Sequence, residues 1–277
     1  MFNINAGERS PRVTLLQILL NSHACTGSDG KRLTVDGVYG HNTGAAVTTA
    51  GKMTGTGGAA TPALIRQLLA DVDLRVITSV DLGDPRLQAD VDRFQRSFDD
   101  PIVLGGMCNG LGQMVQEVST RARPGRVAAL RFDGHGNLGE WLTVSVGNVA
   151  DLRESKILAE RREYAEIAKE TYSYISAENF NMVAGIVQPL SAIFAPFGFA
   201  EHLGCTLGRR PNTQKMLRKL ADLWGVPIRV GVNLQTVGSI EISGPIFTAF
   251  PRGLDLMHWS RQFQTLDLAG RSISTVR

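Results

Sequence analysis

The stretch Val127-Ala-Ala-Leu-Arg-Phe-Asp-Gly-His-Gly136 decides the fold of this 277-residue chain. An apolar run ends there in a polar turn, with a glycine on each side of His135. The pattern recurs about seventy residues later in Phe197-Gly-Phe-Ala-Glu-His-Leu-Gly-Cys205. Short apolar runs bounded by glycine-containing turns are typical of buried parallel strands. Because active sites of parallel sheets lie at the carboxyl ends of the strands, we expect His135 and Cys205 to meet at one edge of a sheet.

Around these two stretches, strand and helix patterns alternate along the chain. Such alternation is typical of an α/β domain with a mostly parallel sheet flanked by helices. Near the end of the chain, two apolar segments are expected to form a hairpin. The predicted strands are residues 102–104, 126–132, 141–146, 197–203 and 227–232, the predicted helices are 111–119, 151–180 and 212–224, and the hairpin segments are 240–242 and 246–250.

Residues 1–70 are predicted to form a small unit of three short helices. Val13, Leu16 and Leu19 recur at helical spacing in the first of them. Thr61-Pro62 opens the third, because threonine caps helices and proline suits their first turn. The stretch 51–60 is rich in glycine and threonine and indicates a loop.

Residues 71–100 connect this unit to an α/β domain that spans residues 101–277. The connector contains a strand pattern over 74–80 and a helix pattern over 85–98.

The first unit resembles the peptidoglycan-binding-domain family of small three-helix bundles found on cell-wall hydrolases. In this pattern Asp36 and Gly37 make a turn, Val38 or Tyr39 plugs the bundle, and Gly40 supplies a backbone conformation closed to other residues. The resemblance implies that residues 13–69 bind peptidoglycan. The loop at 51–60 departs from the family, which usually has a helix there that ends in an aromatic–glutamine pair. The residues that carry the resemblance are Leu16-Gln17, Leu20-Asn21, Val35-Asp-Gly-Val-Tyr-Gly40, Thr43, Ala46-Val47 and Thr61-Pro62.

Composition excludes several classes of protein. Hydrophobic residues make up 43% and charged residues 20% of the chain, so it is globular and core-forming. The net charge is +3 and the basic residues are scattered, so nucleic acid is not an expected partner. Three widely spaced cysteines argue against a disulfide framework, and no His/Cys cluster indicates a metal site. The glycine-rich stretch 105–112 lacks the lysine–hydroxyl pair of a phosphate-binding loop, so no cofactor is expected.

Two segments bear on where the protein is located and on whether it spans a membrane. Met1 to Ser10 lacks the basic start and apolar core of a signal peptide. We therefore expect a protein that is cytoplasmic as made and that leaves the cell by a non-classical route or on lysis, if at all. Met182 to Phe199 is uncharged but barely reaches the ~20 residues of a membrane span, and prolines interrupt it. We expect a buried helix, a loop and a core strand there, and no membrane span.

Cysteine and histidine at neighbouring strand ends can form a nucleophile–base pair. A lone buried cysteine is more often a small hydrophobe, and a lone histidine in a turn is usually structural. The glycines around Cys205 indicate a tight strand-to-helix turn, in which a thiol near a helix N-terminus favours the thiolate. Cys25 lacks such a setting, whereas Cys108 follows another strand and is the alternative thiol.

Residues 101–250 resemble cysteine peptidases of the caspase–gingipain–legumain type, most of all bacterial caspase-like domains. In these, the histidine follows one strand and the cysteine the next. The resemblance implies that Cys205 is the nucleophile, that His135 is the general base, and that the Gly136 and Cys205 amides form the oxyanion hole. The chain departs from the pattern at Gly204, where caspases usually carry alanine or serine. The carboxylates considered as contacts for a basic substrate residue are Asp133, Glu140, Glu201 and Asp222.

The predicted function is therefore a cysteine peptidase or amidohydrolase that acts on a peptide or protein. If the first unit binds peptidoglycan, the substrate extends to cell-wall stem peptides. The alternative is a non-catalytic structural or adaptor component, with a degenerate peptidase-like fold, in a wall-associated or phage-tail-like larger assembly. A third hypothesis is a wall amidase unrelated to caspases.

Overall fold

The computed structural model describes residues 1–81, 87–97, 100–104, 110–136, 140–144, 174–236 and 239–268. Its centre is a six-stranded sheet with the strand order β2-β1-β3-β6-β7-β8. All neighbouring strands run parallel except β8, which is antiparallel to β7. The predicted mostly parallel sheet is thus confirmed. The strands are β1 (Arg75–Asp81), β2 (Ile102–Leu104), β3 (Val127–Asp133), β6 (Phe194–His202), β7 (Ile228–Gly231) and β8 (Ile246–Ala249).

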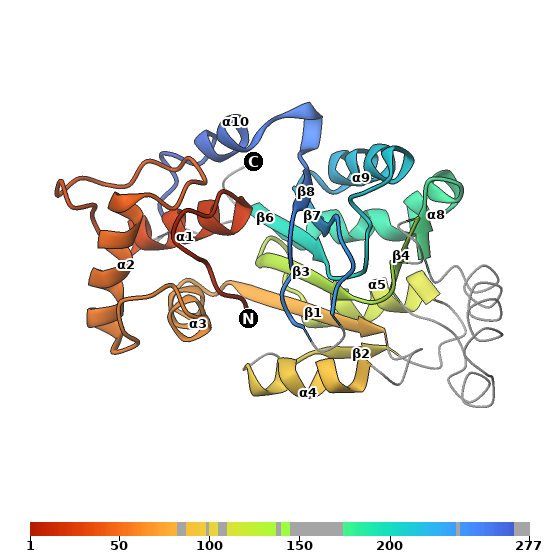
Figure 1. The fold of residues 1–277 in the computed structure, drawn as a ribbon, viewed down its shortest axis with the longest axis horizontal. Helices are drawn as coiled ribbons and strands as arrows, with labels where there is room; N and C mark the ends of the chain where they lie inside the picture. Colours follow the sequence, from red (N-terminus) through yellow and green to blue (C-terminus); the bar gives the residue numbers. More distant parts are fainter. Residues whose placement is uncertain are drawn as a thin grey trace.

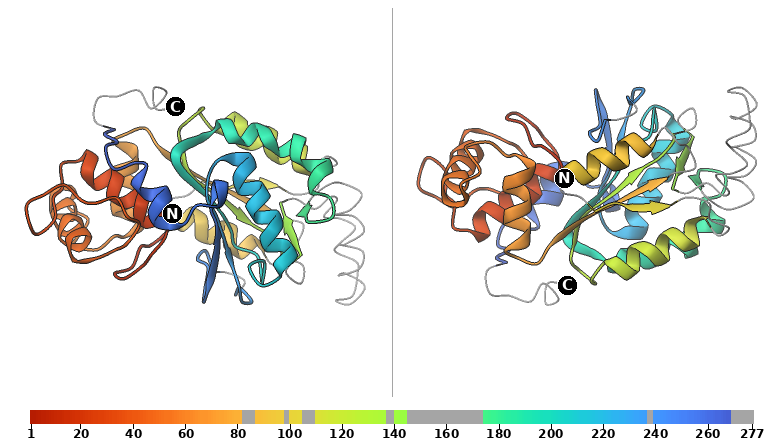
Figure 2. Two further views of the ribbon diagram at one scale, coloured as in Figure 1. Left: turned by 90° about the horizontal axis from the view of Figure 1, so that it is seen from above. Right: turned by 90° about the horizontal axis from the view of Figure 1, so that it is seen from below.

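Helices cover both faces of this sheet, as Figures 1 and 2 show. On one face α4 packs with Val80 and Leu203 through its own Val91 and Phe94. On the other face α5, α8 and α9 bury the larger apolar core. A short antiparallel pair, β4 and β5, lies beside the main sheet. These elements are α4 (Gln88–Arg96), α5 (Gly110–Arg121), α8 (Phe180–Val187), η3 (Gln188–Ala192), α9 (Pro211–Trp224), β4 (Trp141–Thr143) and β5 (Tyr174–Ser176).

The first three helices gather at one end of the sheet (Figure 1). The bounds are α1 (Pro11–Ser22), α2 (His41–Thr54) and α3 (Pro62–Ala70), followed late in the chain by η4 (Pro251–Gly253) and α10 (Leu256–Arg261). The predicted cap at Thr61 is present, because its side chain accepts a hydrogen bond from Leu64 N–H. Ser10 caps α1 in the same way by accepting from Val13 N–H. Helix α1 contacts α2 and α3 but also β6 and α10, so its residues 11–21 are all buried.

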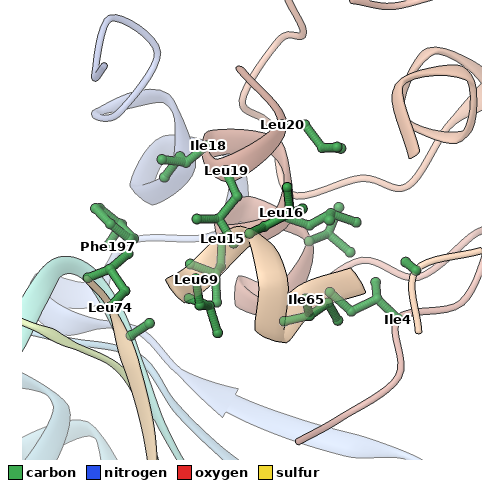
Figure 3. Packing of buried hydrophobic residues seen from close by; sticks show 14 of the residues in the cluster. Ile4, Leu15, Leu16, Ile18, Leu19, Leu20, Ile65, Leu69, Leu74 and Phe197 are labelled. Carbon is green, nitrogen blue, oxygen red and sulfur yellow. The ribbon is translucent and has the colours of Figure 1, made fainter. Parts of the chain in front are cut away.

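One hydrophobic core joins α1–α3 to the sheet (Figure 3). Leu15, Leu19 and Leu69 from the helices share this core with Leu74 and with Phe197 of β6. Residues 71–100, taken from the sequence as a connector, supply β1 to the middle of the sheet and α4 to one face. The first unit therefore packs directly on the α/β part of the chain.

Gln17 organises the turn at Asp36 and Gly37. Its side-chain oxygen accepts from both backbone N–H groups, at 3.1 and 2.9 Å, and its side-chain nitrogen donates to Asp36 Oδ1 at 2.8 Å. Tyr39 is the residue that plugs the core. The expectation for Gly40 was wrong: its φ is −92°, extended backbone that any residue adopts, whereas Gly37 has the left-handed φ of +73°.

Three element boundaries differ from the sequence-based expectation. Helix α2 continues through residues 51–54 of the predicted loop and ends at Gly55, whose φ is +71°. Residues 174–176 form β5 and are not helical, because Tyr174-Ile-Ser176 pairs with β4. Residues 240–242 form no strand, so β8 pairs with β7 instead. The rest of the predicted helix 151–180 up to residue 173, and Cys108, lie outside the described residues.

The segment Met182 to Phe199 divides into most of α8, the proline-containing turn η3 and most of β6, so the predicted order of helix, loop and strand is confirmed. The helix is not buried as expected: Met182 and Ile186 are exposed, and it packs on the core through Phe180, Val183 and Val187. In the part of the chain that the structure describes, no helix is long and apolar enough to cross a membrane.

Candidate active site

The turns that follow β3 and β6 touch each other through their backbones. These strands are parallel neighbours, and Leu203 N–H donates to the Phe132 carbonyl at 2.8 Å just beyond their last paired residues. A Cβ placed on Gly136 would lie 1.9 Å from the carbonyl oxygen of Cys205 and 2.9 Å from its nitrogen. Only glycine permits so close an approach. The structure thus brings His135-Gly136 and Gly204-Cys205 together at the carboxyl edge of the sheet.

Within these turns, both reactive residues are accessible. His135 and Cys205 are half-buried, whereas Gly134, Gly136 and Gly204 beside them are buried. A thiol and an imidazole that are both reachable from solvent, on adjoining backbones, meet the first geometric requirement for a nucleophile–base pair.

The sulfur of Cys205 lies against the backbone of Gln235, in the connection between β7 and β8. Gln235 N–H donates to Sγ at 3.3 Å, and Sγ lies 3.6 Å from the Gln235 carbonyl oxygen, to which the thiol can donate. This backbone amide therefore supplies an N–H donor directly at the sulfur. The expected helix N-terminus does not take this role, because α9 begins only at Pro211, after the turn at residues 205–209.

Thr206 adds backbone strain next to the sulfur. Its φ is +56°, a left-handed conformation that is unusual for a β-branched residue. A hydrogen bond of 2.9 Å from Thr206 N–H to the Asn233 carbonyl holds it there. Such strain persists only where the surrounding structure fixes it, and it is concentrated at functional sites.

The two backbone amides expected to bind an oxyanion are also neighbours. Within the described residues, neither Gly136 N–H nor Cys205 N–H donates a backbone or side-chain hydrogen bond. Two adjacent donors without an acceptor can bind the oxygen of a tetrahedral intermediate.

His202 is a second histidine at this site, and no local pattern beyond its place in the motif marked it as important. Its ring is fully buried. Nε2 lies 2.9 Å from the Thr143 carbonyl, and Nδ1 accepts from Gly204 N–H at 2.9 Å. Burial, with a smaller effect of the charge of His135, lowers the pKa of His202 to about 4. Both ring nitrogens are occupied by the backbone, so His202 cannot act as the general base.

Glu201 is excluded as a contact for a basic substrate residue. Its carboxylate is fully buried and pairs with Arg12 Nε at 2.6 Å, with Arg131 Nε at 3.2 Å, and with Arg229. Burial alone would raise the pKa of Glu201, but these arginines outweigh it and hold the pKa well below its usual range. The residue links α1 to β3, β6 and β7.

The other three carboxylates have different surroundings. Glu140 pairs with Arg210 at 2.8 Å on the surface, and exposed Asp222 accepts from the Arg252 N–H at 2.5 Å. Asp133 is buried, and its Oδ2 has no hydrogen-bond partner among the described residues. Burial and the nearby charge of Asp90 raise the pKa of Asp133 to about 8. Of the four carboxylates, Asp133 is the one that lies two residues before His135 and has a buried oxygen without a hydrogen-bond partner among the described residues.

Cys25, by contrast, is buried in the core of the first unit, and burial raises the pKa of its thiol. A cleft of about 400 Å³ is lined by residues that belong to neither turn, namely Arg93, Arg96, Ser97, Ser239, Ile240 and Glu241. Across the described ranges, no group of three or more histidine, cysteine or acidic side chains is arranged to hold a metal ion. Comparison of the chain with protein families, with curated proteins and with solved structures finds no match.

Proposed function

We propose that this chain is a cysteine-dependent peptidase or amidohydrolase, with Cys205 as the nucleophile and His135 as the general base. The observation that supports it best is the backbone contact between Gly136 and Cys205. That contact brings together a half-buried thiol, a half-buried imidazole and two backbone amides that donate no hydrogen bond within the described residues. These are the parts that acyl transfer to a thiol needs.

In this mechanism His135 takes the proton of the Cys205 thiol, and the thiolate attacks the carbonyl carbon of an amide. The Gly136 and Cys205 amides bind the resulting oxyanion. The intermediate collapses as the C–N bond breaks, and protonated His135 gives its proton to the leaving amine. A thioester remains on Cys205. Water, deprotonated by His135, then attacks the thioester and releases a carboxylic acid and the thiol.

The resemblance to caspase-like peptidases remains a proposal with structural support. The histidine follows β3 and the cysteine follows β6, and these strands are neighbours in the sheet. The resemblance of residues 13–69 to peptidoglycan-binding domains likewise gains support from the Gln17 contacts to the Asp36–Gly37 turn. Because α1 is covered by β6 and α10, we propose that any glycan contacts α2 or α3. A stem peptide of the cell wall would then be a substrate.

The test is hydrolysis of a peptide library and of purified sacculi by the whole chain, followed by mass spectrometry of the new ends. We expect Cys205→Ala to abolish cleavage, and Cys25→Ala, a buried thiol remote from the sheet edge, to leave the cleavage rate unchanged. An unaltered rate in Cys205→Ala would end the assignment. Release of free amino groups from sacculi by Cys205→Ala would instead favour an amidase of another type.

A structural or adaptor role is the second candidate, and one observation favours it. The backbone of Gln235 contacts Sγ with both its N–H and its carbonyl group, so the thiol is partly covered. Selective alkylation of Cys205 by iodoacetamide at neutral pH supports the enzyme. A thiol that does not react, in a chain that cleaves no peptide, supports the adaptor.

A further inference from the structure

We propose that His202 is a positioning residue that holds the Gly204–Cys205 turn against the His135 turn. The inference rests on the proposed function, since it assigns how the two reactive residues keep their mutual placement. His202 touches neither the thiol nor a substrate by this account; it acts through Thr143 and Gly204.

A continuous set of hydrogen bonds runs from one turn to the other. Thr143 donates to the His135 carbonyl through its N–H, at 3.2 Å, and through its hydroxyl, at 2.9 Å. The Thr143 carbonyl in turn lies 2.9 Å from His202 Nε2. On the far side of the ring, Nδ1 accepts from Gly204 N–H at 2.9 Å. The imidazole therefore links Thr143, and through it the His135 turn, to Gly204.

The partners dictate a single form of the ring. Nε2 faces a carbonyl oxygen and must carry the proton, whereas Nδ1 faces an N–H group and must not. Protonating Nδ1 would place two N–H groups against each other and break the bond to Gly204. Burial keeps the ring in the neutral form that this arrangement requires.

Aromatic packing fixes the plane of the ring. Phe132, the last but one residue of β3, stacks on His202 with ring centroids 6.2 Å apart, and Trp224 in turn stacks on Phe132 with ring centroids 6.1 Å apart. The side chains of β3 and α9 thus prevent the imidazole from turning away from its two backbone partners.

His202 also accounts for glycine at position 204. A Cβ there would lie 2.8 Å from His202 Cε1 and Nδ1, and 2.9 Å from the Gly134 carbonyl oxygen. The imidazole fills the space that a side chain at 204 would need. Caspases usually carry alanine or serine before the cysteine. The glycine found there in this chain, Gly204, is therefore coupled to the presence of His202.

Three variants separate the two hydrogen bonds from packing. His202→Phe keeps an aromatic ring and loses both bonds. In His202→Asn, the side-chain oxygen can replace Nδ1 as the acceptor for Gly204, whereas in His202→Gln the side-chain nitrogen can replace Nε2 as the donor to Thr143. Leu68→Ala, in the buried core of α3, is the control for a general loss of stability.

The first measurement is amide hydrogen exchange of the peptide that contains Gly204, made on the whole folded chain. We expect His202→Phe to raise the exchange rate of Gly204 N–H by about tenfold or more, since the amide loses its acceptor. His202→Asn should restore most of the protection. Leu68→Ala should change the protection of Gly204 no more than it changes the protection of the other peptides of the sheet. Equal exchange in wild type and His202→Phe would overturn the proposal, as would equal loss of protection in Asn and Phe variants.

The second measurement is kinetic and uses the alkylation rate of Cys205 by iodoacetamide, localised by mass spectrometry, together with peptide cleavage. Displacement of a nucleophile by about 1 Å can lower a rate by ~100-fold, so we expect His202→Phe to lower kcat strongly with little change in KM. Unchanged kcat and alkylation in a folded His202→Phe would refute the positioning role. If wild type cleaves no peptide yet the exchange result is as expected, the proposed enzyme fails while the role of His202 in joining the turns stands.

Discussion

At the scale of single residues, Gly204 lies where any side chain would meet the His202 ring and the Gly134 carbonyl at once. We predict that Gly204→Ala destabilises the fold by about 1–3 kcal/mol, the usual cost of overpacking a filled site. Because the clash separates the two turns, the rate at which iodoacetamide alkylates Cys205 should also differ from the wild-type rate. Urea denaturation and mapped alkylation measure the two effects.

Gly112 in α5 provides the matched control, since a Cβ there meets nothing within 4 Å. Alanine in a helix is favoured over glycine by up to ~1 kcal/mol, so Gly112→Ala should leave stability unchanged or raise it. If Gly204→Ala behaves like Gly112→Ala in both measurements, the two turns do not touch as described.

Asp133 predicts a dependence of stability on pH. Its pKa rises from 3.8 to about 8 in the folded chain, first through burial and then through Asp90. Between these values the folded state holds a proton that the unfolded state has lost, so stability falls as the pH rises, with a slope of at most about 1.4 kcal/mol per pH unit. We expect Asp133→Asn to flatten this slope and to be more stable than wild type at pH 8.

Thermal unfolding measured from pH 5 to pH 9 checks this expectation. Asp92→Asn, at an exposed position of α4, serves as the control and should keep the wild-type slope. A slope that is unchanged in Asp133→Asn would contradict the assignment of this pH dependence to Asp133.

At the scale of elements, Glu201 attaches α1 to the sheet, because its carboxylate pairs with Arg12 of α1 as well as with Arg131 and Arg229. Glu201→Gln would leave three buried guanidinium groups without their shared carboxylate. We predict a loss of about 3–5 kcal/mol, typical of breaking a buried ion pair from one side. Chemical denaturation measures it.

Glu140→Gln is the comparison for this prediction. Glu140 and Arg210 form a half-exposed pair, and such surface pairs contribute about 0–1 kcal/mol. Equal losses in the two glutamine variants would show that the Glu201 cluster does not hold α1 to β6.

The elements that could be predicted from the sequence are those with strong local signals. Apolar runs that end in glycines predicted β3 and β6, and helical spacing predicted α9. Tyr174-Ile-Ser176 was mistaken for helix because its strand character depends on pairing with β4, which no local pattern encodes. The placement of Gln235 against Cys205 was equally hidden, since it follows from how the connection after β7 folds back. His202 was missed because its role depends on Thr143, distant in sequence.

At the scale of the whole molecule, the sequence suggested two units joined by a connector, whereas the packing joins them in one core. Arg12 and Gln17 are polar residues within the apolar pattern of α1. Both are nevertheless buried, because Glu201 pairs with Arg12 and the Asp36–Gly37 turn pairs with Gln17. Polar residues whose partners come from elsewhere cannot be told from surface residues in the sequence alone.

This shared core predicts that the helices α1–α3 and the sheet unfold together. Leu19 is fully buried in α1, within the core that also contains Phe197 of β6. We expect Leu19→Ala to cost about 2–5 kcal/mol and to lower hydrogen-exchange protection equally in peptides from α1 and from β6. Leu217→Ala, in the core beneath α9, should likewise lower hydrogen-exchange protection equally in peptides from α1 and from β6. If Leu19→Ala opens α1–α3 while β6 keeps its protection, the first unit folds independently, and the Arg12–Glu201 attachment then joins two separate domains.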